Sequence, residues 1–275
     1  MNKEITIAII NDIHHNKESV QQLKKYWNQK KITADYIISC GDFVSIKTDE
    51  QTDMTKVNPA IEECHEHIHE LETLCSNVLF VPGNHDPSYL FENNLNNHIS
   101  LSEHSINLHR NIHRIRENLI VVGCGGCVPK TIEGKFKKVG YPYKTDQEFQ
   151  KDIETVLPSD GNVPNCSKED NIILVTHCGP SCSHTSLEFP PGKPIHQIGS
   201  DCLSQLIESK EYNQRITCLL HGHAHDSQGF VQHYHVPIIN PGAVKRNHCF
   251  CLITLRENDN EWIVVDVHFQ NFLLH

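Results

Sequence analysis

The segment Val78–Asp86, with the sequence VLFVPGNHD, joins an apolar strand-like run to a turn of polar residues that can bind metals. The arrangement recurs along the chain, at 5–10 before Asp12 and His14, 36–39 before Asp42, 172–176 before His177, and 218–220 before His223 and His225. In open α/β sheets, ligands bind just beyond the carboxyl ends of the strands. Five strand ends that carry Asp, Asn and His to one edge therefore predict a cluster that binds two metal ions.

The composition is that of a globular protein and argues against two other classes. The 275 residues are 38% hydrophobic, with a mean hydropathy of -0.43. The 24 Lys and Arg against 34 Asp and Glu give a net charge of -10, whereas domains that hold nucleic acid usually carry a basic face. No apolar run approaches the ~18–20 residues of a membrane span. We therefore expect no membrane partner and no stable nucleic-acid binding, and the 21 His are a first sign of metal chemistry.

The first residues and the cysteines indicate a cytoplasmic protein. Residues 1–4, with the sequence MNKE, run almost directly into a strand-like segment, which leaves no room for the apolar region and cleavage site of a signal peptide. Several of the 12 cysteines lie in apolar runs, among them Cys218, Cys249 and Cys251. We interpret them as buried thiols of a protein in a reducing compartment.

Hydrophobic periodicity predicts alternating strands and helices. Strands are expected at 4–10, 35–39, 78–81, 119–123, 171–176, 216–220, 236–239, 249–255 and 261–269, and helices at 17–30, 56–76, 145–156 and 200–210. Strands that alternate with helices pair in parallel, whereas the last strands follow one another closely and predict an antiparallel end. Residues 125–170 are the least regular part and predict a loop-rich insertion. We expect the chain, residues 1–275, to form a single domain.

The order of the polar motifs resembles that of the calcineurin-like metallophosphoesterase superfamily. The blocks that carry the resemblance are Asp12-x-His14, Gly41-Asp42, Gly83-Asn84-His85-Asp86, His177 and Gly222-His223-x-His225. The loops Gly199-Ser200 and Asn240-Pro241-Gly242 are similar to later loops of its small cytosolic, phosphodiesterase-like branch. The resemblance implies an α/β fold, a four-layer αββα sandwich of two mixed β-sheets flanked by helices.

The resemblance also implies a role for each motif residue. Asp42 would bridge two divalent ions, one completed by Asp12, His14 and His225 and the other by Asn84, His177 and His223. Mixed nitrogen and oxygen ligands suit Mn, Fe, Zn or Co, and the spacing does not choose among these transition metals. His85, which is not a ligand, would stabilise the transition state or protonate the leaving oxygen. Asp86 resembles the carboxylate that orients this imidazole.

The implied activity is hydrolysis of small phosphate esters through attack by a hydroxide that bridges the two metals. We expect a phosphodiesterase that acts on small nucleotide-like or cyclic-nucleotide substrates. A phosphomonoesterase with the same metal centre is the alternative, and a non-catalytic scaffold of the same fold is a third interpretation. The complete set of seven ligands, together with His85, disfavours the scaffold. The choice between diester and monoester, and the oligomeric state, stay open at this stage.

Other histidines, cysteines and tyrosines are expected to lie outside the site. His15 directly follows His14 and is predicted to lie at the surface or to support a ligand without binding metal itself, and His221 is predicted to face the edge of the sheet. Residues 64–69, with the sequence CHEHIH, are predicted to form a solvated helix, on which His65 and His69 share a face. The pair Cys124 and Cys127 has no second CxxC motif beside it and indicates a tight turn. Tyr141 and Tyr143 are expected to pack locally rather than to contact substrate.

Overall fold

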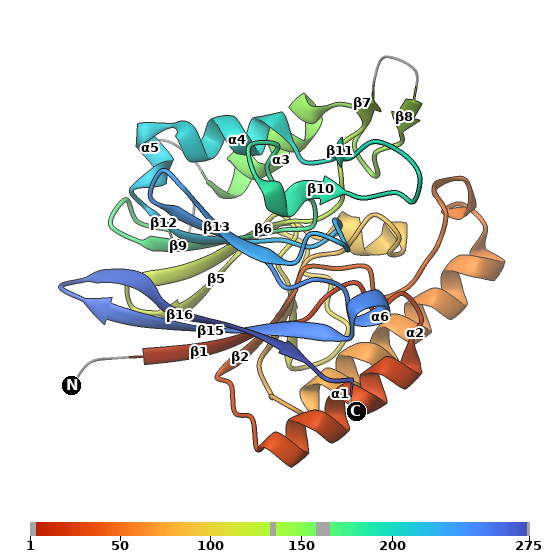
Figure 1. The fold of residues 1–275 in the computed structure, drawn as a ribbon, viewed down its shortest axis with the longest axis horizontal. Helices are drawn as coiled ribbons and strands as arrows, with labels where there is room; N and C mark the ends of the chain where they lie inside the picture. Colours follow the sequence, from red (N-terminus) through yellow and green to blue (C-terminus); the bar gives the residue numbers. More distant parts are fainter. Residues whose placement is uncertain (1–3, 133–135, 158–165, 274–275) are drawn as a thin grey trace.

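Two six-stranded β-sheets form the centre of the molecule in a computed structural model, which describes residues 4–132, 136–157 and 166–273 (Figure 1). The strands of the first sheet, in spatial order, are β16 (Glu261–Asn271), β15 (Cys249–Asn258), β1 (Glu4–Ile9), β2 (Tyr36–Ser39), β3 (Val78–Phe80) and β4 (Ser105–Asn107). Those of the second are β13 (Gly229–His233), β14 (Val236–Asn240), β12 (Ile216–Leu220), β9 (Asn171–Thr176), β6 (Leu119–Cys124) and β5 (Asn111–Arg116).

Both sheets are mixed. In the first sheet β1, β2, β3 and β4 are parallel, and β15 and β16 are added antiparallel at one side. In the second sheet β6, β9, β12 and β14 are parallel, and the two outer strands β5 and β13 are antiparallel to their neighbours. The expected antiparallel end of the chain is confirmed by the long β15–β16 pair.

Helices cover the outer faces of the two sheets. The helices are α1 (Lys17–Lys30), α2 (Met54–Glu72), α3 (Asp146–Val156), α4 (Asp201–Glu208), α5 (Lys210–Asn213) and α6 (Val244–Asn247), with 3-10 turns η1 (Thr48–Glu50), η2 (Ser88–Glu92) and η3 (His184–Ser186). Figure 1 shows α1 and α2 below the first sheet and α3, α4 and α5 above the second. The predicted four-layer αββα sandwich is therefore confirmed.

Three apolar clusters hold these layers together. The central cluster lies between the sheets and draws residues from both, for example Ile7 and Leu79 from the first and Ile173 from the second. Along β1, Ile7 faces this cluster, while Ala8 faces a second cluster between the first sheet and helices α1 and α2. A strand buried on both faces is a continuous apolar run, which explains why the segment 5–10 predicts a strand so clearly.

The structure departs from the predicted elements mainly at the edges of the sheets. Strands β4, β5 and β13 were not predicted, and the predicted helix 200–210 ends at Glu208, before the separate short helix α5. The predicted insertion 125–170 contains a small hairpin, β7 (Lys130–Ile132) with β8 (Phe136–Lys138), as well as α3. Its residues 133–135 and 158–165 lie outside the described part of the chain. A second small hairpin joins β10 (Leu187–Glu188) and β11 (His196–Gln197).

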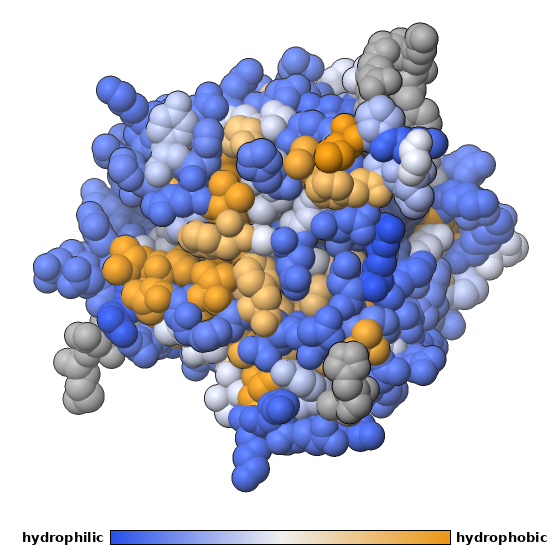
Figure 2. Space-filling model, viewed as in Figure 1, coloured by the Kyte–Doolittle hydropathy of each residue, from blue (hydrophilic) through white to orange (hydrophobic). Residues whose placement is uncertain are grey.

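The outer strands β13 and β16 carry exposed apolar side chains, among them Phe230 and Ile263. Figure 2 shows apolar surface gathered on the left of the view, where the β15–β16 pair lies in Figure 1.

All twelve cysteines are free thiols. Among the described residues, no helix has both the length and the apolar character needed to cross a bilayer.

Candidate metal centre

The ends of five strands bring the predicted site residues to one place. Strands β1, β2 and β3 of the first sheet lead into the segments that carry Asp12, Asp42 and Asn84. Strands β9 and β12 of the second sheet lead into those that carry His177 and His223. Within the first sheet β1, β2 and β3 run parallel to one another, and within the second sheet β9 and β12 do the same. The site therefore lies where the carboxyl ends of the two sheets meet.

Six of the seven predicted ligands form two groups that share one residue. Within each group, the ligand atoms all lie within 4.8 Å of one another, and the groups are Asp12, His14, Asp42 and His225, and Asp42, His177 and His223. Asp42 is common to both, which is the arrangement that a bridging carboxylate requires. The seventh, Asn84, joins the second group, because its Oδ1 lies 3.0 Å from His177 Nε2.

The distances within these groups suit coordination to a metal ion. His225 Nε2 lies 3.3 Å from Asp12 Oδ1, and Asp42 Oδ2 lies 3.4 Å from His177 Nε2 and 3.5 Å from His14 Nε2. Two ligand atoms that are each about 2.0–2.2 Å from one ion lie roughly 3.0–3.5 Å apart at ordinary coordination angles. The side chains already have the spacing of a coordination shell.

Two buried carboxylate oxygens in this cluster have no hydrogen-bond partner. These are Asp12 Oδ1 and Asp42 Oδ2, the oxygens that face the histidines. Burial alone would raise the pKa of both carboxyls, but His225 beside Asp12 and His177 beside Asp42 outweigh it and hold both pKa values below the ordinary range. Buried, ionised and unpartnered oxygens are costly unless a cation compensates them. The residues present therefore fit a divalent metal centre.

Hydrogen bonds on the far side of two imidazoles fix which nitrogen faces the cluster. His177 Nδ1 donates to the carbonyl oxygen of Cys40 at 2.7 Å, and His14 Nδ1 lies 2.9 Å from Ser45 Oγ. Their Nε2 atoms are thereby left for a metal, a common device around metal-binding histidines. Burial lowers the pKa of His14 to about 4, so its imidazole is neutral near pH 7. Neutral imidazole is the form that binds metals.

Four predicted ligands have a left-handed backbone conformation. The φ angles are 55° for Asp12, 49° for His14, 58° for Asp42 and 66° for His223. A non-glycine residue in this region costs about 1–3 kcal/mol and persists only where its surroundings enforce it, most often at functional sites. Here the loops enforce it on one another, since Asp12 N donates to Gly41 O and His14 N donates to Asp42 O, both at 2.9 Å.

Two motif glycines are required because the loops approach so closely. A Cβ at Gly83 would collide with the Asp42 side chain. A Cβ at Gly222 would lie 2.6 Å from Asn11 Nδ2 and 2.8 Å from Asp12 Oδ2. Neither glycine has an unusual φ, so space rather than backbone freedom selects them. Any larger residue would move a carboxylate of the cluster.

The predicted role of Asp86 as the residue that orients His85 is wrong. Asp86 Oδ2 accepts from the backbone N–H groups of Asp42 and Gly83, at 2.8 and 2.7 Å, and Oδ1 accepts from Val44 N at 3.1 Å. Its fully buried carboxylate therefore ties together the loops after β2 and β3. The His85 imidazole is oriented instead by its Nδ1, which donates to Ile46 O at 3.2 Å. The adjacent positions of His85 and Asp86 in the sequence suggested a hydrogen bond between their side chains, but each side chain bonds to a different part of the backbone.

A cleft of about 410 Å³ opens over one half of the cluster. It is lined by His14, Ser45, His85, His225, Lys245 and Arg246. Neither cation was predicted from the sequence, although both closely follow the motif Asn240-Pro241-Gly242. Lys245 N donates to Asp12 O at 3.0 Å, and Arg246 forms an ion pair with Asp226 at 3.0 Å. The cleft thus joins two of the predicted metal ligands, His14 and His225, to positive charge suited to an anion.

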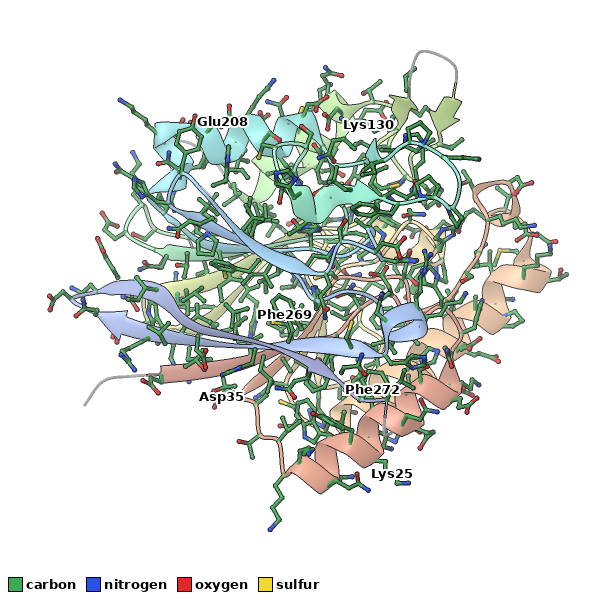
Figure 3. All side chains as sticks on the ribbon, in the orientation of Figure 1. Lys25, Asp35, Lys130, Glu208, Phe269 and Phe272 are labelled. Carbon is green, nitrogen blue, oxygen red and sulfur yellow. The ribbon has the colours of Figure 1, made fainter. Side chains whose placement is uncertain are left out.

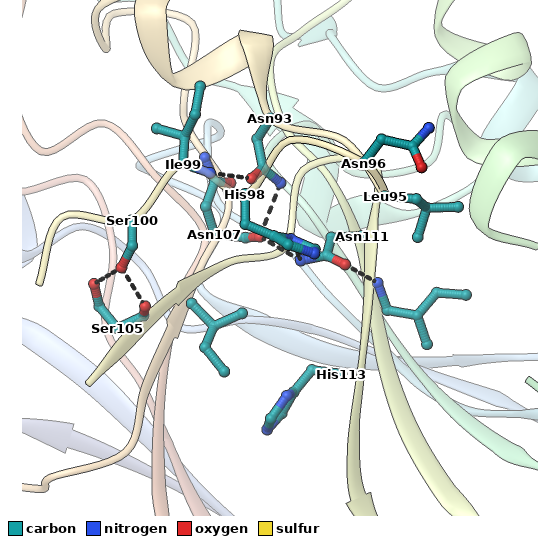
Figure 4. A pocket seen from close by; sticks show the side chains of 12 residues that line it. Asn93, Leu95, Asn96, His98, Ile99, Ser100, Ser105, Asn107, Asn111 and His113 are labelled. Carbon is teal, nitrogen blue, oxygen red and sulfur yellow. Dashed lines mark hydrogen bonds between the residues drawn. The ribbon is translucent and has the colours of Figure 1, made fainter. Parts of the chain in front are cut away.

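Another pocket, of about 590 Å³, lies away from this chemistry, between η2, β4 and β5. Figure 4 shows that its polar side chains largely bond to one another and to nearby backbone, as Asn93 does to Ile99 N and Asn107 O. It contains none of the seven predicted metal ligands. We therefore assign the chemistry to the Asp/His cleft.

The remaining singled-out residues mostly have structural roles. His15 is at the surface, as predicted, where it bonds to Glu63. Tyr143 packs locally, with its ring centroid 5.0 Å from that of Phe149. The prediction that residues 64–69 form a solvated helix is wrong for His67, which is buried on the inner side of α2. His221 is fully buried and lies 2.7 Å from Thr185 Oγ1. Cys124 and Cys127 are buried thiols, and burial raises the pKa of Cys127 to about 12.

Comparison with known proteins agrees with this geometry. The family model of calcineurin-like phosphoesterases matches residues 5–227, which include all the predicted ligands. The chain belongs to the calcineurin-like phosphoesterase family. No curated protein matches it in sequence.

Solved structures share the fold of this family member at low sequence identity. TT1561 from Thermus thermophilus aligns with a TM-score of 0.60 and 15% identity over 98% of this chain and 100% of its own. A dimetal phosphatase from Danio rerio aligns with a TM-score of 0.57 and 11% identity over 98% and 99% of the two chains. A further crystal structure aligns with a TM-score of 0.65 and 14% identity over 98% and 100%. At such identities the likeness establishes the fold alone.

Proposed function

We propose that the protein is a phosphodiesterase that hydrolyses small nucleotide-like esters with two divalent metal ions. The observation that carries this proposal is the sharing of Asp42 between two groups of ligand atoms. When bound, two such ions neutralise phosphate charge and lower the pKa of a water molecule that attacks phosphorus. The proposed ligands are those predicted from the sequence: Asp12, His14, Asp42, Asn84, His177, His223 and His225. The proposed metal ions are Mn, Fe, Zn or Co.

His85 is proposed to serve the leaving group. It lines the cleft beside His14, with the two ring centroids 5.4 Å apart, yet it belongs to neither ligand group. Its Nδ1–H is held by the Ile46 carbonyl, which leaves Nε2 for the substrate. In the doubly protonated form, His85 Nε2–H would donate a proton to the leaving oxygen. A positioned acid of this kind contributes roughly 10²–10⁴-fold in rate.

The remainder of the cleft supports a substrate larger than inorganic phosphate. Lys245 and Arg246 are exposed at the rim, and neither belongs to the ligand groups. Arg binds phosphate oxygens through paired N–H groups, and Lys acts as a point charge. We propose that these cations hold the anionic part of the substrate that extends beyond the metal ions.

A comparison of two chromogenic esters tests the diester proposal. The purified protein, loaded in turn with Mn²⁺, Zn²⁺ and Co²⁺, is assayed with bis(p-nitrophenyl) phosphate and p-nitrophenyl phosphate. We expect a higher kcat/KM for the diester with at least one metal. A higher kcat/KM for the monoester with every metal would contradict this and favour the phosphomonoesterase. No turnover of either ester, in protein that binds two metal ions, would favour the non-catalytic scaffold.

We further propose that residues 1–275 act as one domain in the cytoplasm. The central apolar cluster, which contains Ile5 near the start of the chain and Trp262 near its end, supports the single domain. The twelve free thiols support a reducing compartment.

A further inference from the structure

A third group of metal-ligating side chains lies outside the cluster described above. Cys182, Glu208 and His233 each offer a ligand atom, and these atoms lie within 4.8 Å of one another. The three residues come from separate elements, namely the segment between β9 and η3, the last residue of α4, and the last residue of β13. Glu208 is labelled in Figure 3, where α4 approaches α5.

The spacing and the donor types suit one zinc ion. His233 Nε2 lies 3.4 Å from Glu208 Oε1, which is close to the edge of a tetrahedron whose corners are each about 2.0–2.2 Å from the metal. Thiolate, imidazole and carboxylate together favour Zn²⁺ over Mg²⁺ or Ca²⁺, which prefer oxygen ligands alone. His233 is 30% exposed and Glu208 is 44% exposed at their side chains, so an ion can reach them from solvent.

Neighbouring contacts hold the group in place and connect it to the main site. Cys182 N donates to Ser204 Oγ of α4 at 2.9 Å, and the His233 ring packs edge-on against Tyr234. From Cys182 the chain continues to Thr185, whose Oγ1 lies 2.7 Å from His221 Nε2. His221 stands two residues before the proposed ligand His223.

We propose that Cys182, Glu208 and His233 bind a single Zn²⁺ ion, with water as the fourth ligand. The ion ties α4 and β13 to the segment that follows His177. It thereby stabilises the loops next to the dinuclear centre without taking part in hydrolysis. Three protein ligands and one water molecule complete the four-coordinate tetrahedral shell that Zn²⁺ prefers. Asp42 and its partner ligands include no cysteine, so thiolate coordination distinguishes the new site from the dinuclear one.

Titration with Cd²⁺, a thiolate-seeking stand-in for zinc, tests the proposal on the metal-loaded protein. Sulfur-to-cadmium charge transfer absorbs in the ultraviolet, and ligands of the dinuclear centre cannot produce it. We expect an absorption that saturates at one Cd²⁺ per chain and that added Zn²⁺ removes. Cys182→Ala should abolish it. Cys202→Ala is the matched control, since Cys202 is also a half-buried thiol, and it should keep the full absorption.

The other two ligands give an independent readout. His233→Ala and Glu208→Gln should each weaken Cd²⁺ binding at least roughly tenfold, and Zn²⁺ should raise the Tm of the wild type but not of Cys182→Ala. Absence of the absorption in the wild type would overturn the proposal. So would its persistence in Cys182→Ala, or its resistance to added Zn²⁺.

Discussion

The two oxygens of Asp42 have different surroundings. Oδ1 accepts from the backbone N–H of His85 at 2.8 Å, whereas Oδ2 lacks a hydrogen bond and lies within 3.5 Å of the Nε2 atoms of His14 and His177. Its backbone N–H donates to Asp86, so the residue is fixed at both ends. One carboxylate thus joins both halves of the cluster and also holds the proposed acid in position.

At the residue scale, His85→Ala separates metal binding from catalysis. Because His85 donates no ligand atom to either group, the variant should keep the metal content of the wild type. Its kcat should fall by about 10²–10⁴-fold with an alkyl leaving group. An ester of p-nitrophenol should suffer less, because this leaving group departs readily without a proton. Metal content and both rates are measured on the same preparation.

The matched control for this experiment is His223→Ala, which should lose metal and impair both substrates together. Equal losses of rate for the two leaving groups in His85→Ala would favour electrostatic stabilisation over proton donation. Unchanged rates would remove His85 from the reaction.

At the scale of elements, the loops that follow the strands are packed against one another with little free space. Gly222→Ala should push the Asp12 carboxylate away, because the new Cβ would lie 2.8 Å from Asp12 Oδ2. We expect metal affinity to fall at least roughly tenfold, as it does when a residue that orients a metal ligand is lost, while the circular dichroism of the fold is retained. The measurement is a metal titration of the metal-free protein.

Gly229→Ala provides the comparison at this scale. At Gly229 the nearest atom to a new Cβ is 3.5 Å away, in ordinary van der Waals contact. Metal affinity should therefore stay at the wild-type value. An unaltered affinity in Gly222→Ala would show that the loops have more freedom than their spacing suggests.

Apart from the outer strand β16, the predicted strands lie inside the two large sheets, whereas the missed strands β4, β5 and β13 lie at their edges. The run 5–10 is wholly apolar apart from Thr6 and forms a central strand, whereas β5, with the sequence NIHRIR, alternates with polar residues and pairs on one side only. Likewise β13 has an intermediate-to-exposed pattern and begins with glycine. Short edge strands give a weak apolar pattern in the sequence, because many of their side chains face solvent and can be polar.

The clustering of these Asp, Asn and His side chains could be predicted because strand ends place them by simple geometry, but the contacts that support the cluster could not. The three backbone donors to Asp86 depend on how two loops turn, and the sequence order alone suggested an interaction with His85. Lys245 and Arg246 carry no motif of their own and reach the cleft only through the short helix α6. Tertiary packing decides such contacts.

At the scale of the molecule, Trp262 joins the two sheets near the starts of β6 and β9. It belongs to β16 of the first sheet, is 2% exposed, and its Nε1–H donates to Asn118 Oδ1 at 2.8 Å, just before β6 of the second. Trp262→Ala should lower the free energy of unfolding by about 3–5 kcal/mol, as measured by urea denaturation. Because the predicted ligand His177 follows the opposite end of β9, metal content should not change.

Trp262→Phe serves as the control, since it keeps most of the apolar contact and loses the hydrogen bond. Its cost should be about 1–3 kcal/mol, because Asn118 Oδ1 is left without this donor. Equal costs for the two variants would indicate that packing between the sheets contributes little at this position.

Elemental analysis of purified variants shows whether Asp42 bridges two metal ions. We predict two metal ions per chain in the wild type and a loss from both sites in Asp42→Ala. The terminal-ligand variant His225→Ala should lose metal mainly from the single site to which His225 belongs. An Asp42→Ala protein that keeps two full equivalents would contradict the bridging role and the mechanism that depends on it.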